Sequence, residues 1–174
     1  MLMCSNRVVL RPTRGADLAR IRQLQDLAYA PELPPDRYSG LRSRLKAGGA
    51  VCAVVEVGGS VVGHVQALPW PSGHVLRLDE RLAPGAAQGD SLFVYEVVVH
   101  PAMQGRGLAR RLMAEVERQA RRRGVSRLGL VAYGQAAGYW QVLGFRPHPL
   151  RDDAARDALA SYGGQGQYML KALD

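Results

Sequence analysis

Cysteine is scarce in this chain, which argues against a disulfide-stabilised protein and against a protein with a cysteine-bound metal. The cysteines among the 174 residues are Cys4 and Cys52, too few for a disulfide framework and not spaced as metal ligands are. We expect both thiols to be reduced, with Cys52 as a small core residue. Metal-ligand spacing is also lacking among the four histidines, which are His64, His74, His100 and His148. The sequence therefore predicts no metal site.

Long apolar runs are missing as well. No stretch approaches the ~20 residues that a membrane-spanning helix requires. The first residues, MLMCSNRVVLRP, lack the apolar core and small-residue cleavage site of a secretory signal. We therefore expect a cytoplasmic protein without membrane association.

No repeat, low-complexity segment or linker divides the chain, so we expect one domain over residues 1–174.

Lysine is almost absent, because Lys46 and Lys171 are the only two and the other basic residues are arginine. The formal net charge is nonetheless +8, which favours a polyanionic partner such as nucleic acid or a nucleotide-like cofactor. No basic–aromatic interleaving or recognised nucleic-acid motif accompanies this charge. We therefore expect no nucleic-acid partner.

The hydrophobic pattern predicts an α/β (α+β) fold with a mixed, mostly antiparallel sheet of six to seven strands and about four helices. Helical spacing of apolar residues predicts helices over 17–29, 36–47, 105–123 and 135–143. Extended apolar runs predict strands over 7–11, 91–100, 127–132, 145–148 and 167–172, with a hairpin around Gly58-Gly59. Residues 71–90, rich in proline and glycine, predict a long loop with room for one helical turn.

The junction between the strand over 91–100 and the following helix carries the main functional signal, in the sequence QGRGLA over residues 104–109. A helix N-terminus offers unpaired backbone N–H groups and partial positive charge, which suit a phosphate. Gly105, Gly107 and Ala109 would let a ligand approach this backbone closely. Positive charge is added by Arg106, Arg110 and Arg111. The alternative is that the glycines only form a tight turn.

Two other phosphate-binding patterns fail at this junction. The dinucleotide fingerprint G-x-G-x-x-G, started at Gly105, would require glycine where Arg110 stands. The Walker pattern requires Gly-Lys-Ser/Thr, which does not occur.

Residues 97–113, VVVHPAMQGRGLARRLM, resemble the acetyl-CoA-binding signature of the GNAT superfamily of N-acetyltransferases. Its pattern Gln/Arg-x-x-Gly-x-Gly/Ala is met by Gln104, Gly107 and Ala109. Residues 139–145, YWQVLGF, are similar to a second segment of the same superfamily, and the predicted element order fits the GNAT fold. The resemblance implies acetyl-CoA as co-substrate. The residues it assigns to acetyl-CoA are Val97, Val98, Val99, Gln104, Gly105, Arg106, Gly107, Leu108, Ala109, Arg110 and Trp140.

The resemblance also implies a carboxylate general base on the central strand, where Glu96 is the only acid. Strand alternation places Glu96 on the face of Val94 and Val98, with Tyr95 on the opposite face. We expect an apolar setting there, suited to a carboxylate that accepts a proton. The alternative is a glutamate that faces solvent or pairs with an arginine.

The proton donor for the leaving thiolate is less clearly marked. The family often has a tyrosine where this chain has Trp140, and an indole cannot protonate a thiolate. The neighbouring Tyr139 is our candidate general acid. Tyr133, Tyr162 or solvent remain the alternatives.

The resemblance implies an N-acetyltransferase that moves an acetyl group from acetyl-CoA to a primary amine by direct attack in a ternary complex. It also implies that the acceptor, a small-molecule amine or a protein amino group, binds between the first two helices and the loops near residues 31–40 and 71–90. The alternative is an acyl-CoA-binding sensor or a catalytically weak GNAT-like protein. The resemblance also makes a homodimer an expectation.

Overall fold

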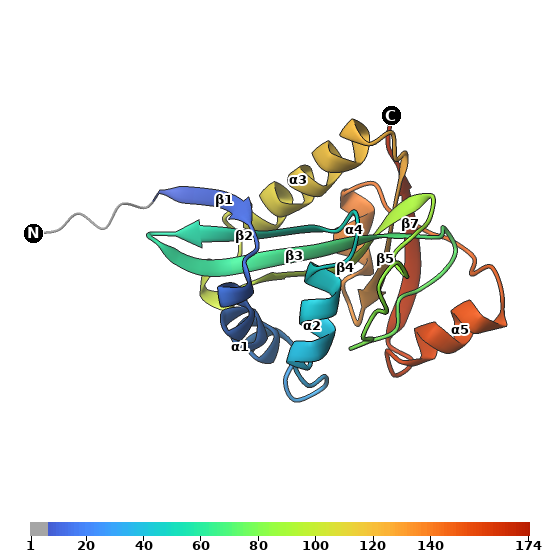
Figure 1. The fold of residues 1–174 in the computed structure, drawn as a ribbon, viewed down its shortest axis with the longest axis horizontal. Helices are drawn as coiled ribbons and strands as arrows, with labels where there is room; N and C mark the ends of the chain where they lie inside the picture. The colour runs from blue at the N-terminus through green and yellow to red at the C-terminus, as the bar shows by residue number, and fades with distance from the viewer. Residues whose placement is uncertain (1–6) are drawn as a thin grey trace, which may run out of the picture.

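The computed structural model describes residues 7–174, so Cys4 lies outside the described residues. The described chain forms seven strands in one sheet, with helices on both faces (Figure 1). The strands are β1 (Val8–Pro12), β2 (Val51–Val57), β3 (Ser60–Trp70), β4 (Ser91–Val99), β5 (Arg127–Tyr133), β6 (Arg146–Pro147) and β7 (Gly166–Ala172). The helices are α1 (Leu18–Tyr29), α2 (Tyr38–Leu45), α3 (Leu108–Arg122), α4 (Ala137–Val142) and α5 (Asp153–Ala160), with 3-10 turns η1 (Gly15–Asp17) and η2 (Pro101–Met103).

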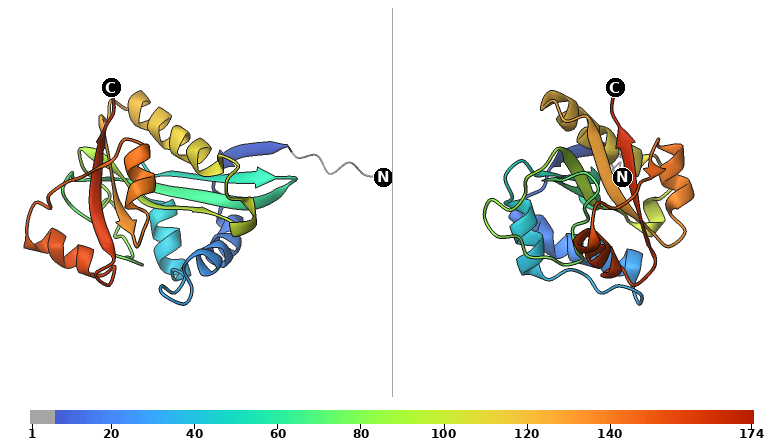
Figure 2. Two further views of the ribbon diagram at one scale, coloured as in Figure 1. Left: turned by 180° about the vertical axis from the view of Figure 1, so that it is seen from behind. Right: turned by 90° about the vertical axis from the view of Figure 1, so that its right-hand side faces the viewer.

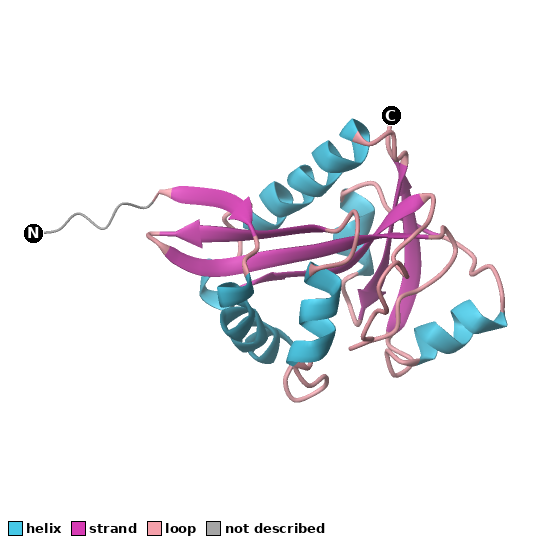
Figure 3. Cartoon of the chain, in the orientation of Figure 1, coloured by secondary structure: helices cyan, strands magenta, loops and turns pink. Residues whose placement is uncertain are grey.

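The sheet order is β1-β2-β3-β4-β5-β7-β6. Neighbouring strands are antiparallel except β4 and β5, which are parallel and joined through α3. Helix α3 lies on one face of β2, β3 and β4, and α1 and α2 lie on the other face (Figures 1 and 3). Figure 2 shows the same two helical layers from behind and from the side. The predicted fold class is therefore confirmed.

Helix α3 is built on the predicted apolar stripe. Leu108, Leu112, Val116 and Ala120 recur every four residues and are buried against β2, β3 and β4. The helix begins at Leu108, three residues later than predicted. Gly105 and Gly107 have left-handed backbone angles, which a right-handed helix cannot contain. The helix can therefore begin only after Gly107.

Strand β4 contains a β-bulge at Tyr95. Gln66 of β3 pairs with Glu96, and the next β3 residue, Ala67, pairs with Val94, so Tyr95 is an extra residue. Val94 packs in the core under α3, whereas Tyr95 packs on the other face and Glu96 contacts α1. The prediction that Glu96 shares a face with Val94 and lies opposite Tyr95 is therefore wrong, because the extra residue resets the alternation.

Other elements differ from prediction in extent. Helix α5 was not predicted. Its N-cap is Asp152, which accepts a hydrogen bond from the Ala155 N–H, and an aspartate before a helix is a start signal that can be read from the sequence. Residues 71–90 form a loop without a helical turn.

Cys52 is a free thiol, and burial raises its pKa to about 12. Among residues 7–174, no helix is long and apolar enough to cross a membrane.

A buried carboxylate joins β1 to the start of α1. Asp17 accepts hydrogen bonds from both terminal nitrogens of Arg11, at 2.8 and 2.9 Å, and from the Arg14 N–H at 2.7 Å. Arg11 also donates to Glu56 on β2. The Arg11 hydrogen bond holds the pKa of Asp17 below its ordinary value. Asp17 thus stabilises the fold in its ionised form.

We expect Asp17→Asn to lower the free energy of unfolding by about 2 kcal/mol at neutral pH, because it removes charge-assisted hydrogen bonds. The pKa of Asp17 is depressed in the folded state, so its contribution is present above the ordinary aspartate value of about 4 and is lost as the pH falls below it. Urea denaturation at pH 7 and pH 3 measures this difference. The exposed Asp153→Asn is the control, and an equal loss at both pH values would contradict the assignment.

Candidate functional site

A cleft opens where β4 and β5 separate. Their pairing ends at Val94 and Leu130, although β4 continues to Val99 and β5 to Tyr133. The cleft has a volume of about 640 Å³ and is lined by these two strands, the turn before α3, the end of α1, and α4. Beyond the bulge, the β4 backbone is therefore free to pair with a bound molecule instead of with β5.

The glycine turn forms one end of this cleft. Gly105 and Gly107 have φ angles of 76° and 73°, and a Cβ at either position would meet no atom within 4 Å. Glycine is therefore required here by the backbone conformation and not by crowding within the protein. The Arg111 N–H bonds to the Gly107 carbonyl, so the N–H groups before it lack helical acceptors and are available to an anion.

The structure brings almost all predicted site residues together. Glu96 and Tyr139 line the cleft, and so do the residues predicted to bind acetyl-CoA, with the exception of Arg106. Arg106 is exposed and does not line the cleft. Trp140 lines the cleft and also packs edge-on against Phe145, at 5.5 Å between ring centroids.

Glu96 occupies a buried polar setting. Its side chain is 8% exposed, and Nε2 of His64 lies 2.6 Å from Oε1. The Gln25 amide donates to Oε1 at 3.0 Å and to Oε2 at 3.1 Å. The expected apolar setting is therefore wrong, and so is the alternative of a solvated or arginine-paired glutamate. Instead, the Gln25 amide on α1 donates to both carboxylate oxygens, and the His64 imidazole on β3 contacts Oε1.

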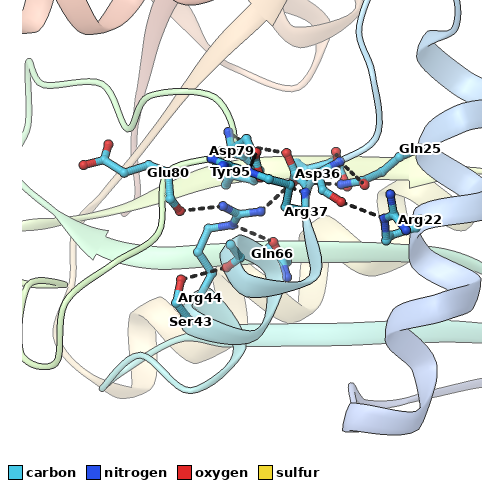
Figure 4. A network of polar contacts seen from close by, with 12 residues as sticks. Arg22, Gln25, Asp36, Arg37, Ser43, Arg44, Gln66, Asp79, Glu80 and Tyr95 are labelled. Atoms are coloured by element: carbon cyan, nitrogen blue, oxygen red, sulfur yellow. Dashed lines mark hydrogen bonds and ion pairs between the residues drawn. The ribbon is translucent and has the colours of Figure 1, made fainter.

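A second buried carboxylate, Asp36, lies beside Glu96 at the centre of a polar network (Figure 4). It accepts hydrogen bonds from the Gln25 amide at 3.0 Å, from the Tyr95 hydroxyl at 3.1 Å and from Arg44. Arg44 is fully buried and stacks on the Tyr95 ring, with its guanidinium 4.1 Å from the centroid. Burial raises the pKa of Asp36, Arg44 lowers it, and the nearby Glu96 raises it. This network anchors the bulged residue of β4.

The candidate proton donors differ in where they lie. Tyr162 is excluded, because its hydroxyl donates to the Leu76 carbonyl and it does not line the cleft. Tyr133 and Tyr139 do line it. Burial raises the pKa of Tyr139, while Arg110 lowers it.

Three residues of the site went unrecognised in the sequence: Gln25, Tyr29 and His64. Gln25 lies four residues after Ile21, within the apolar stripe of α1, and a buried glutamine in such a stripe is the signal that was available. Tyr29 follows one turn later and lines the cleft. Burial raises the pKa of Tyr29 well above its ordinary value, and the charge of Glu96 raises it further.

The chain resembles known proteins over most of its length. Residues 18–145 match the model of the Acetyltransferase (GNAT) family. Serotonin N-acetyltransferase 2, chloroplastic, from Oryza sativa subsp. japonica is 38% identical over 84 residues, which are 47% of this chain and 40% of that protein. The chain covers less than half the length of the curated relatives it matches.

Two solved structures share the fold. The ribosomal-protein-S18-alanine N-acetyltransferase from Escherichia coli has a TM-score of 0.66 and 15% identity, over 97% of this chain and 95% of that one. Rv2747 from Mycobacterium tuberculosis, in complex with CoA, has a TM-score of 0.67 and 20% identity, over 95% of this chain and 99% of that one.

Arg44→Met tests the polar network. It leaves Asp36 buried without its cation, so we expect the free energy of unfolding to fall by about 3–5 kcal/mol. Adding Asp36→Asn removes the unpaired charge and should recover part of the loss. Guanidinium denaturation of the single and double variants measures both effects. A double variant no more stable than Arg44→Met would contradict the assigned pairing.

Proposed function

The chain belongs to the GNAT family of acetyltransferases, and we propose that it transfers an acetyl group from acetyl-CoA to a primary amine by direct attack in a ternary complex. One observation carries the proposal: unpaired N–H groups at the start of α3 and the buried carboxylate of Glu96 line the same cleft. The first feature suits a pyrophosphate, and the second suits a base for the amine.

The proposed acetyl-CoA lies between β4 and β5. The backbone N–H groups of 105–109, with Arg110, would hold the pyrophosphate. The backbone of Val97–Val99, unpaired on its β5 side, would bind the pantetheine arm alongside Trp140. The thioester supplies an activated acyl group with a thiolate as leaving group. The structure of Rv2747, which has the same fold, contains CoA, and this supports CoA as the class of ligand.

The amine loses one proton and the sulfur gains one. In the proposed reaction the amine nitrogen attacks the thioester carbon, Glu96 accepts the proton from nitrogen, the new C–N bond forms and the C–S bond breaks. The sulfur departs from the same thioester carbon that the amine attacks, which the proposal places next to Glu96. Tyr29 and Tyr139 both line the cleft, and the charge of Glu96 acts on the pKa of Tyr29 whereas that of Arg110 acts on the pKa of Tyr139. Because the charge of Glu96 acts on the pKa of Tyr29, our proposal assigns protonation of the thiolate to Tyr29 in preference to Tyr139.

Release of free CoA thiol from acetyl-CoA, measured against a panel of small amines and peptide N-termini, tests the proposal. We expect turnover with at least one amine, and Glu96→Gln should lower kcat by roughly a hundredfold or more, as loss of a general base does. The affinity for acetyl-CoA should not change, because the turn before α3 is untouched. Tight binding of acetyl-CoA with no turnover across the panel would instead indicate an acyl-CoA sensor.

Tyr29→Phe and Tyr139→Phe form a matched pair for the proton donor. We expect Tyr29→Phe to lower kcat by at least tenfold near pH 7, and Tyr139→Phe to have the smaller effect. The Tyr29→Phe defect should shrink above about pH 8.5, near the ordinary thiol pKa, because the thiolate then needs no proton. A larger loss in Tyr139→Phe would reverse the assignment.

A further inference from the structure

We infer that Gln25 and His64 are positioning residues for Glu96: they hold Oε1 of its carboxylate within the protein and leave Oε2 to accept the proton of the amine. The inference rests on the proposed function, because it assumes that Glu96 is the base. It adds two residues, from α1 and β3, to a site whose other parts come from β4 and the turn before α3.

His64 fixes Oε1. It lies on β3 opposite Val98, is fully buried, and its Nε2 is 2.6 Å from Oε1 of Glu96. This close contact restrains Oε1, although neither ring nitrogen of His64 has a partner placed with hydrogen-bond geometry among the described residues. The β2 neighbour of His64 is Val54, an apolar residue. Glu96 is therefore the ionisable partner of this imidazole within the sheet.

The orientation of the Gln25 amide is set by the protein backbone. Its oxygen accepts a hydrogen bond from the Asp36 N–H at 3.0 Å, which only the oxygen can do. Its nitrogen consequently faces the carboxylates, 3.0 Å from Oδ2 of Asp36 and 3.0 and 3.1 Å from the two oxygens of Glu96. Each of the two N–H bonds thus serves one carboxylate. Gln25 separates two acids that would otherwise repel each other.

The two oxygens of Glu96 are therefore not equivalent. Oε1 has both His64 and Gln25 as partners, whereas Oε2 has the longer contact to Gln25. Glu96 lines the cleft, so Oε2 retains the lone pair that can face an acceptor amine. The N–H bond of the amine breaks and the Oε2–H bond forms, while Oε1 keeps its partners.

The charged and titratable groups around Glu96 come from each element packed on this face. They are Tyr29 on α1, Asp36 before α2, Arg44 on α2, His64 on β3 and Tyr95 on β4. Arg44 is paired with Asp36, and the Tyr95 hydroxyl donates to Asp36. Among the described residues, His64 is thus the titratable group in direct contact with the Glu96 carboxylate.

His64→Leu and His64→Gln test this inference in the full chain. Leucine fills the space without a polar group, whereas glutamine keeps a polar group in the place of the imidazole. We expect His64→Leu to lower kcat tenfold or more with an unchanged KM for acetyl-CoA, and His64→Gln to recover most of the loss. The acid limb of kcat/KM should move to higher pH in His64→Leu, because the ionised carboxylate has lost a polar neighbour. Wild-type kcat and pH profile in His64→Leu would overturn the inference.

Gln25→Leu should lower kcat in the same way, with Gln23→Leu on the exposed face of α1 as its matched control. In a Glu96→Gln background, neither His64→Leu nor Gln25→Leu should lower kcat further, since a positioning residue acts only through its partner. Additive losses would indicate a general effect on the fold and would refute the positioning role.

A measurement without turnover separates this inference from the proposed function. In protein labelled with ¹³C at glutamate carboxyls, the Glu96 resonance can be titrated with pH in the wild type and in His64→Leu. We expect a higher midpoint in the variant. If no amine supports turnover but the midpoint moves, the proposed reaction fails and the pairing stands. An unmoved midpoint overturns the pairing even in an active enzyme.

Discussion

One extra residue in β4 determines how the rest of the site is arranged. The bulge at Tyr95 ends the pairing of β4 with β5 after Val94, so the two strands separate and leave a cleft between them. The same residue turns Glu96 toward α1, where Gln25 donates to it. The side chain of Tyr95 is held by Arg44, which stacks on its ring, and by Asp36, which accepts its hydroxyl. A local irregularity is thus stabilised by a buried network that reaches α2.

The bulge also divides the site chemically between the two faces of the sheet. On the side of α3, the cleft offers backbone N–H groups and Arg110, which suit an anion. On the side of α1, it offers Glu96 and Tyr29, which suit proton transfer. Because β4 contributes backbone to one side and a carboxylate to the other, a thioester lying along it would meet both sets of groups. This arrangement explains why a single strand carries so much of the proposed chemistry.

Sequence patterns anticipated the parts of this site that depend on local spacing. The turn over 104–109 and the stripe of α3 follow from residues close together in the chain, and the structure has both. The bulge did not follow, because no glycine or break in hydrophobicity marks Tyr95 within an apolar strand. The contacts of Glu96 were equally inaccessible, since Gln25 is 71 residues away in sequence and His64 is on another strand. Their proximity depends on the register of β3 and β4 and on the packing of α1.

The partners of the two buried acids also explain why we propose Glu96, and not Asp36, as the base. Asp36 is paired with the guanidinium of Arg44 and accepts two further hydrogen bonds, so its oxygens are committed to holding α1, α2 and β4 together. Glu96 has an amide and an imidazole as its partners. A guanidinium in contact with Glu96 would favour the ionised form so strongly that the carboxylate would be a poor proton acceptor. The fold places the cation on Asp36 and a neutral amide between the two acids, so Glu96 is oriented without a guanidinium in contact with it.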